Sequence, residues 1–188
     1  ADTPEARAAR HRVEHAQVVH PDDFARFAEL GLVASMEPPH AVEDMPWAED
    51  RLGPERIRGA YAWRTFLEAG VPLTFNADNP GSDHSPFYGI HSAVTRRNPS
   101  LEPEGGWYPE QAVTTEEAVR AYTTGAAYAA HLDDRTGVLA VGRWADLTVL
   151  DVDPFRIVRD GPPQVILGGR ALLTIVGGEV VHDGREAR

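Results

Sequence analysis

The stretch Arg12-Val13-Glu14-His15-Ala16 opens the part of the chain that decides the fold, because it is typical of a short strand that ends in a histidine. Two later stretches have the same form: Leu32-Val33-Ala34-Ser35-Met36, which continues into Glu37-Pro38-Pro39-His40, and Pro72-Leu73-Thr74-Phe75-Asn76-Ala77-Asp78. In each, an apolar run is followed by a residue that can bind a metal or move a proton. Residues of this kind at the carboxyl ends of strands indicate a hydrolase site of the barrel type.

The pattern between these strands predicts helices. One is expected at Phe24–Leu30, where Gly31 stops it, and another over residues 54–69, where Gly70 stops it. Strands that alternate with helices of this length indicate βαβ units and a parallel sheet. The Pro-rich and acidic residues 37–53 are expected to form a loop, as are residues 76–85, and a further helix is expected within residues 86–97.

The second half of the chain changes character. A long loop over residues 98–114 leads to a helix that Thr114 or Thr115 caps and that runs to about residue 131. From residue 137 onward the pattern predicts short strands at Leu147–Leu150 and at residues 165–167, 172–176 and 179–182. We therefore expect two domains, residues 1–136 and residues 137–188, of which the second is built from strands.

Composition excludes several classes of protein. The 188 residues carry a net charge of −11, which argues against a surface for nucleic acids. The chain has no cysteine, so disulfides and thiolate metal ligands are excluded. No apolar run approaches the ~20 residues of a membrane span and no signal peptide is visible, so a cytoplasmic location is expected. The length is below the ~250 residues typical of a complete (β/α)₈ barrel.

Seven stretches, in order, resemble the C-terminal half of enzymes of the amidohydrolase superfamily, and within it the amidohydrolase 3 (YtcJ-like) group of metal-dependent hydrolases. The resemblance covers nearly the whole chain, and the order and spacing of the stretches make it specific. They are residues 12–17, 34–40, 76–80, 109–114, 121–129, 142–151 and 173–178.

The resemblance implies a fold and a set of roles. It implies that the chain is the C-terminal part of a (β/α)₈ TIM barrel, strands six to eight, followed by strands of the small amidohydrolase β-domain. The first, second and third strands above would be strands six, seven and eight. His15 would then be a metal ligand, Asp78 a general base and metal ligand, and His40 a contact to the substrate. A divalent metal, most simply zinc, would activate water to cleave a carbon–nitrogen bond other than a peptide bond in a small molecule.

The chain departs from the family pattern by omission, since it has no His-x-His pair. Ala77 stands where a Ser or Thr is usual, and Glu37 follows Met36 where Gln is frequent. We expect a fragment that is inactive alone and binds metal weakly. Two open sheet edges would be covered by a missing N-terminal half or by a second copy of the chain. The alternative function is a binding or assembly domain that keeps the fold without the chemistry.

Each candidate residue also has a simpler interpretation. His15 could be a hydrogen-bonded core histidine, and His40 could be a histidine of a surface loop. Asp78 could serve an Asx turn before Asn79, and the neighbouring pair Asp83 and His84 competes with it as a source of ligands. The family resemblance favours His15 and Asp78, whereas the two interpretations of His40 stay equally weighted.

Overall fold

The first half of the molecule is built around a small parallel sheet. The structure, a computed structural model, describes residues 3–156, 162 and 164–185. Strands β1 (Arg12–Glu14), β2 (Val33–Met36) and β3 (Leu73–Phe75) pair in the order β1-β2-β3, all parallel. In this register Val13 lies beside Ala34 and Met36 lies beside Phe75, so the carboxyl ends of the three strands meet at one edge. The parallel sheet expected from the sequence is confirmed.

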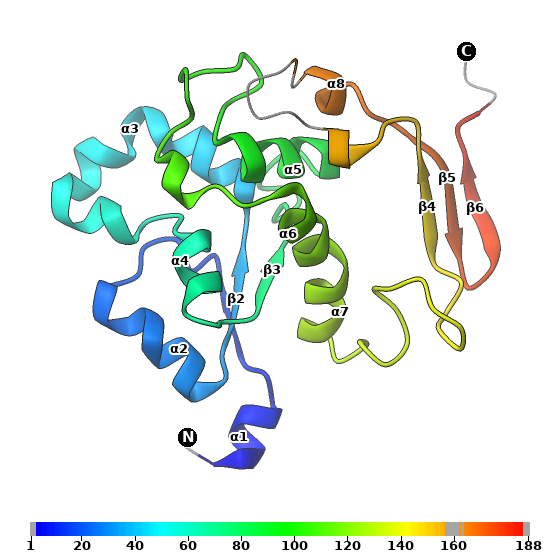
Figure 1. Ribbon diagram of the computed structural model, residues 1–188, viewed down its shortest axis with the longest axis horizontal. Coiled ribbons are helices and arrows are strands. Elements are labelled where there is room, and N and C mark those ends of the chain that lie inside the picture. The colour runs from blue at the N-terminus through cyan, green and yellow to red at the C-terminus, as the bar shows by residue number, and fades with distance from the viewer. Residues whose placement is uncertain (1–2, 157–161, 163, 186–188) are drawn as a thin grey trace.

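Helices surround this sheet (Figure 1). Gly31 ends α2 (Phe24–Leu30), as predicted, and adopts a left-handed conformation, and Thr114 and Glu117 form a capping box at the start of α6 (Thr115–Arg120). The helices are α1 (Pro4–Ala8), α2 (Phe24–Leu30), α3 (Pro38–Arg56), α4 (Trp63–Glu68), α5 (Pro86–Thr95), α6 (Thr115–Arg120), α7 (Ala126–Ala129) and α8 (Gln164–Leu167), with 3₁₀ turns at Pro21–Asp23, Ile57–Gly59, Pro109–Gln111 and Pro154–Arg156 and a π-helical turn at Ala121–Gly125.

The predicted loop over residues 37–53 is wrong, because α3 occupies this part of the chain. Its two leading prolines, Pro38 and Pro39, lie in the first turn, where a proline loses no intrahelical hydrogen bond. The helix is interrupted at Gly53, which has a φ of 74°. The predicted helix over residues 54–69 is therefore divided among the end of α3, the 3₁₀ turn Ile57–Gly59 and α4.

The last part of the chain forms a second sheet. Strands β4 (Leu147–Leu150), β5 (Ala171–Val176) and β6 (Glu179–Asp183) are antiparallel in the order β4-β5-β6, and Gly177 and Gly178 turn the β5–β6 hairpin. The strand predicted over residues 165–167 is wrong, since these residues belong to α8. A short apolar run fits a buried helical turn as well as a strand, and Ile166 is buried there. The boundary between residues 136 and 137 stays a prediction.

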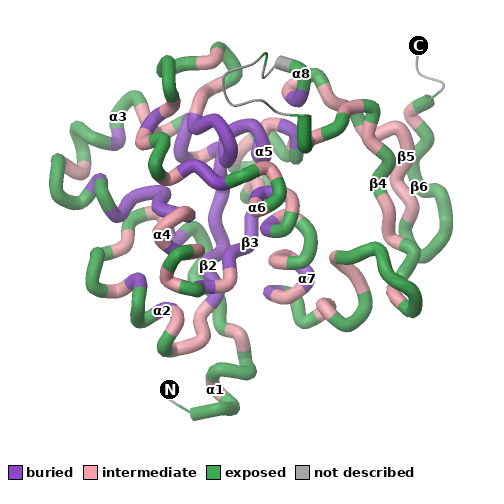
Figure 2. The backbone as a smooth tube through the Cα atoms, in the orientation of Figure 1, coloured by how far each residue is buried: buried purple, intermediate pink, exposed green. Residues whose placement is uncertain are grey.

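Buried residues gather on β2, β3 and α5, whereas the β4–β6 sheet is largely exposed (Figure 2). The core includes a fully buried arginine, Arg96, which follows α5. Its guanidinium lies over the ring of Trp63 at 4.2 Å and near that of Trp107 at 5.2 Å. It donates to the carbonyl oxygens of Trp107 and Tyr61 at 2.8 and 3.0 Å. Burial lowers the pKa of Arg96 to about 9, so the group stays charged at neutral pH.

The two edges of the parallel sheet differ. All three residues of β1 are exposed, so its outer edge is open. By contrast, β3 is buried and packs against the π-helical turn Ala121–Gly125: the hydroxyl of Thr74 donates to the carbonyl oxygen of Ala121, and Gly125 lies against the carbonyl oxygen of Leu73. Among the described residues neither β1 nor β3 pairs with a second strand, and the expectation that a missing half or a second copy covers these edges stays a prediction. Among the described helices, none is long and apolar enough to cross a membrane.

Candidate metal centre

The residue that directly follows each parallel strand is polar. His15 follows β1, Glu37 follows β2 and Asn76 follows β3, and the parallel pairing places all three at one edge of the sheet. The His15 Nδ1 atom lies 3.0 Å from Oε2 of Glu37, and Nδ2 of Asn76 donates to Oε1 of the same carboxylate at 2.8 Å. A continuous row of hydrogen bonds therefore crosses the ends of the three strands.

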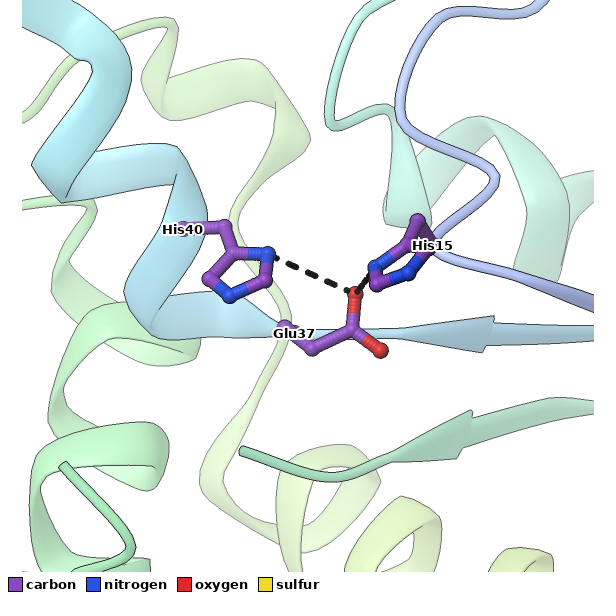
Figure 3. A group of neighbouring side chains, drawn as sticks. All are labelled: His15, Glu37 and His40. Atoms are coloured by element: carbon purple, nitrogen blue, oxygen red, sulfur yellow. Dashed lines mark hydrogen bonds and ion pairs between the residues drawn. The ribbon is translucent and has the colours of Figure 1, made fainter. Parts of the chain in front are cut away.

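His40 completes a cluster of metal-ligand types. It lies in the first turn of α3, and its Nδ1 is 3.7 Å from the same Glu37 oxygen. The His15 and His40 rings are stacked, with centroids 5.9 Å apart and planes inclined by 17° (Figure 3). One ligand atom from each of His15, Glu37 and His40 lies within 4.8 Å of the other two. Two imidazoles and a carboxylate are a donor set that suits zinc and other divalent metals.

Burial differs sharply within the cluster. The Glu37 side chain is 3% exposed, that of His40 18% and that of His15 46%. Burial raises the pKa of Glu37, and the hydrogen bond from Asn76 and the nearby charge of His15 act in the opposite direction. The buried carboxylate thus contacts the imidazole of a half-exposed side chain, whose other nitrogen, Nε2, has no hydrogen-bond partner among the described residues.

The backbone at the end of β1 is unusual. His15 and Ala16 have φ values of 67° and 38°, in the left-handed region that side chains other than glycine rarely occupy. Such a conformation costs about 1 kcal/mol or more for each residue and persists only where the surroundings fix it. Strain of this kind is frequent at functional sites, which is consistent with a role for His15 beyond packing.

The third predicted site residue, Asp78, is placed differently. It is exposed in the loop after β3, and its backbone N–H donates to Oδ1 of Asn76 at 2.8 Å. A carbon atom at Cβ of Gly81 would lie 2.9 Å from a carboxylate oxygen of Asp78, so this carboxylate faces its own loop. Asp78 is not in the cluster with His15, Glu37 and His40, and its catalytic role stays a prediction. The rival Asp83 accepts a hydrogen bond from the N–H of Ser85.

Glu37 and Asn76 were not among the predicted site residues. The sequence contains a signal for both, because each is the first residue after an apolar strand, as His15 is. A hollow of about 340 Å³, lined by Arg12 and His131 among others, lies beside the start of β1 and includes no residue of the cluster. The chemistry of the strand ends, rather than this hollow, therefore identifies the candidate site.

Comparison with known proteins gives a consistent result. The YtcJ amidohydrolase of Bacillus subtilis is 33% identical over 181 residues, which are 96% of this chain and 33% of that protein. The N-substituted formamide deformylase of Arthrobacter pascens is 32% identical over 148 residues, 76% of this chain and 26% of that protein. The crystal structure of an uncharacterized metal-dependent hydrolase from Pyrococcus furiosus has a TM-score of 0.67 and 33% identity, covering 78% of this chain and 29% of that one.

The chain thus spans about a quarter to a third of the length of the curated relatives that it matches. A model described as the amidohydrolase family matches residues 1–182, which is almost the whole of the sequence. The likeness is therefore distributed over both sheets rather than confined to one motif. On these grounds the chain belongs to the amidohydrolase family.

Proposed function

We propose that this chain supplies part of the metal centre of a hydrolase that cleaves a carbon–nitrogen bond in a small molecule. The observation that carries the proposal is the cluster of His15, Glu37 and His40 at the carboxyl ends of parallel strands. The His15 side chain is 46% exposed and its Nδ1 faces Glu37, so Nε2 would bind a divalent metal, for which zinc is the simplest choice because imidazole suits it. Such a metal lowers the pKa of bound water to about 7 and polarises a carbonyl group.

The other residues have separate roles in this proposal. His40 is 18% exposed and lies beside His15, so it is placed to contact a substrate bound at the metal. Asp78 would accept the proton of the attacking water and bind the metal in addition. This role requires its carboxylate to turn from Gly81 toward the strand ends, and the exposed position of Asp78 leaves it room to do so.

The proposal extends to the architecture. Strands β1, β2 and β3 would be strands six, seven and eight of a (β/α)₈ barrel, and the β4–β6 sheet would belong to the small β-domain of residues 137–188. The parallel order β1-β2-β3 and the antiparallel order of the second sheet support this assignment. The open edge of β1 would be covered by the rest of the barrel or by a second copy of the chain.

A catalytic metal needs about three protein ligands and one open position. In the described residues Nδ1 of His15 already faces Glu37, which leaves that imidazole one nitrogen for a metal. We therefore propose that this chain alone binds zinc weakly and has no turnover, and that activity appears when the remaining length of its relatives is present. The carbon–nitrogen bonds to test include those of N-substituted formamides, because a relative at 32% identity is named as their deformylase.

The experiment compares zinc content and hydrolysis of amides and N-substituted formamides by this chain and by the complete protein that contains it. In the complete protein, His15→Gln should lower turnover at least ~100-fold because a metal ligand is lost. His20→Gln is the matched control, since His20 is 69% exposed on a loop. Full activity of His15→Gln would contradict the role of His15. A stoichiometric, tightly held zinc in this chain alone would contradict its incompleteness.

A further inference from the structure

The hydrogen-bond row across the strand ends has a defined direction. The backbone N–H of Asp78 can only donate, so the Asn76 atom that faces it at 2.8 Å is the carbonyl oxygen Oδ1. The amide nitrogen Nδ2 must then face the other way, toward Oε1 of Glu37 at 2.8 Å and the hydroxyl of Ser35 at 3.1 Å. One backbone group therefore fixes the orientation of Asn76, and Asn76 holds one oxygen of Glu37.

The hydrogen bond between Glu37 and His15 has a defined direction as well. An ionised carboxylate accepts hydrogen bonds and donates none, so the His15 nitrogen at 3.0 Å from Oε2 carries the hydrogen. A neutral imidazole has one N–H and one lone pair, and a hydrogen on Nδ1 leaves the lone pair on Nε2. His40 does not form a hydrogen bond to the same carboxylate oxygen, because its Nδ1 is 3.7 Å from Oε2 of Glu37, beyond hydrogen-bond distance.

We propose that Glu37, held in place by Asn76, is a positioning residue that fixes His15 in the Nδ1–H tautomer and presents Nε2 as the free lone pair. The Nε2 atom belongs to a side chain that is 46% exposed, whereas the Glu37 side chain is 3% exposed. The consequence for metal binding rests on the function proposed above for His15. The tautomer is a property of the metal-free chain and is tested without any metal.

Replacement of Glu37 by glutamine tests the direction of the row. Asn76 continues to present Nδ2, so the glutamine must turn its oxygen toward Asn76 and its NH₂ group toward His15. An NH₂ group that faces Nδ1 requires a lone pair there, which transfers the ring hydrogen to Nε2. The nearly isosteric variant Glu37→Gln should therefore reverse the tautomer. Glu43→Gln is the control, because Glu43 lies exposed on α3, just beyond Glu37, and its carboxylate accepts a hydrogen bond from Ser82.

The measurement is a long-range ¹H–¹⁵N NMR spectrum of the ring nitrogens of His15 in the metal-free chain at about pH 8, where an ordinary imidazole is neutral. In the wild type and in Glu43→Gln, the hydrogen of the His15 ring is expected on Nδ1. In Glu37→Gln it is expected on Nε2. A wild-type His15 ring with its hydrogen on Nε2 would overturn the proposal. The wild-type spectrum alone gives this result, so the test does not depend on whether a variant folds. An unchanged tautomer in Glu37→Gln would overturn it as well.

A zinc titration of the same samples separates this inference from the proposed function. If both hold, Glu37→Gln should weaken zinc binding by about 10- to 100-fold, in line with other residues that orient a metal-binding histidine. Should zinc bind without any change at the His15 ring nitrogens, the tautomer result would stand and the role of His15 as a ligand would be contradicted. The failure of one proposal is therefore distinguishable from the failure of the other.

Discussion

The ion pair between Arg64 and Glu117 gives a prediction about stability that the structure makes quantitative. Arg64 lies on α4 and Glu117 on α6, and the pair is bidentate, with N–O distances of 2.8 and 2.6 Å. The Glu117 carboxylate also accepts the backbone N–H of Thr114 at 2.7 Å in the capping box. The hydrogen bonds from Arg64 are the largest cause that lowers the pKa of Glu117, from an ordinary 4.5 to about 2.

The change is Glu117→Gln, which keeps an oxygen for the capping box and removes the charge. The side chains of Arg64 and Glu117 are 24% and 31% exposed, so water screens the pair in part. Charge-assisted hydrogen bonds at such a site contribute about 1–2 kcal/mol, well below the value that the full pKa shift would give. We therefore expect the free energy of unfolding at pH 7 to fall by about 1–2 kcal/mol.

The pH dependence of this difference has a definite sign. The unfolded chain takes up a proton at Glu117 near pH 4.5, whereas the folded chain resists protonation until about pH 2. The contribution of the Glu117 carboxylate to the free energy of unfolding is therefore fully present above pH 4.5 and is lost as the pH falls toward 2. Urea unfolding of wild type and Glu117→Gln from pH 7 to pH 2.5 measures it. Glu116→Gln, whose partner Arg120 is 68% exposed, should change stability by less than ~0.5 kcal/mol. Equal losses of stability in both variants, or a difference that grows in acid, would show that the Arg64–Glu117 pair does not stabilise the fold in this way.

Two further substitutions test the packing around the parallel sheet. In Gly125→Ala the new Cβ would lie 2.3 Å from the carbonyl oxygen of Leu73 on β3, so the free energy of unfolding should fall by about 1–3 kcal/mol despite the better helix propensity of alanine. A stabilised Gly125→Ala variant in thermal unfolding would contradict that contact. Arg96→Lys should lower the free energy of unfolding by about 2–4 kcal/mol, because lysine cannot donate to both carbonyl oxygens that Arg96 binds. The neighbouring variant Arg97→Lys is the control and should lower it by less than ~1 kcal/mol in the same assay.

The sequence was sufficient to predict the parallel sheet because β2 and β3 are short, largely apolar runs and a glycine ends the helix before each of them. It was insufficient for α3, where proline and acidic residues are typical of a loop. Pro38 and Pro39 fit the first turn of a helix, and Pro46 is accommodated farther along it. Residues 165–167 show the opposite error, since a run of three apolar residues carries no periodicity that separates a strand from a helical turn.

The sequence predicted two residues of the candidate site, His15 and His40, and missed a third, Glu37. His15 and His40 were chosen because histidines at strand ends are conspicuous, and the structure brings them together. Glu37 occupies the same kind of position, but its function depends on which side chains reach across neighbouring strands, and spacing along the chain does not contain that information. Asp78 was chosen through the family resemblance, and its carboxylate direction depends on the conformation of the loop after β3.

The proposed role of His15 is to bind a divalent metal through Nε2. The most direct measurement is a crystal structure of the zinc-loaded protein with anomalous diffraction data at the zinc edge. A zinc peak is expected about 2.0–2.1 Å from Nε2 of His15, with Glu37 still hydrogen-bonded to Nδ1. A zinc peak at another group of residues, with Nε2 of His15 unligated, would contradict the claim.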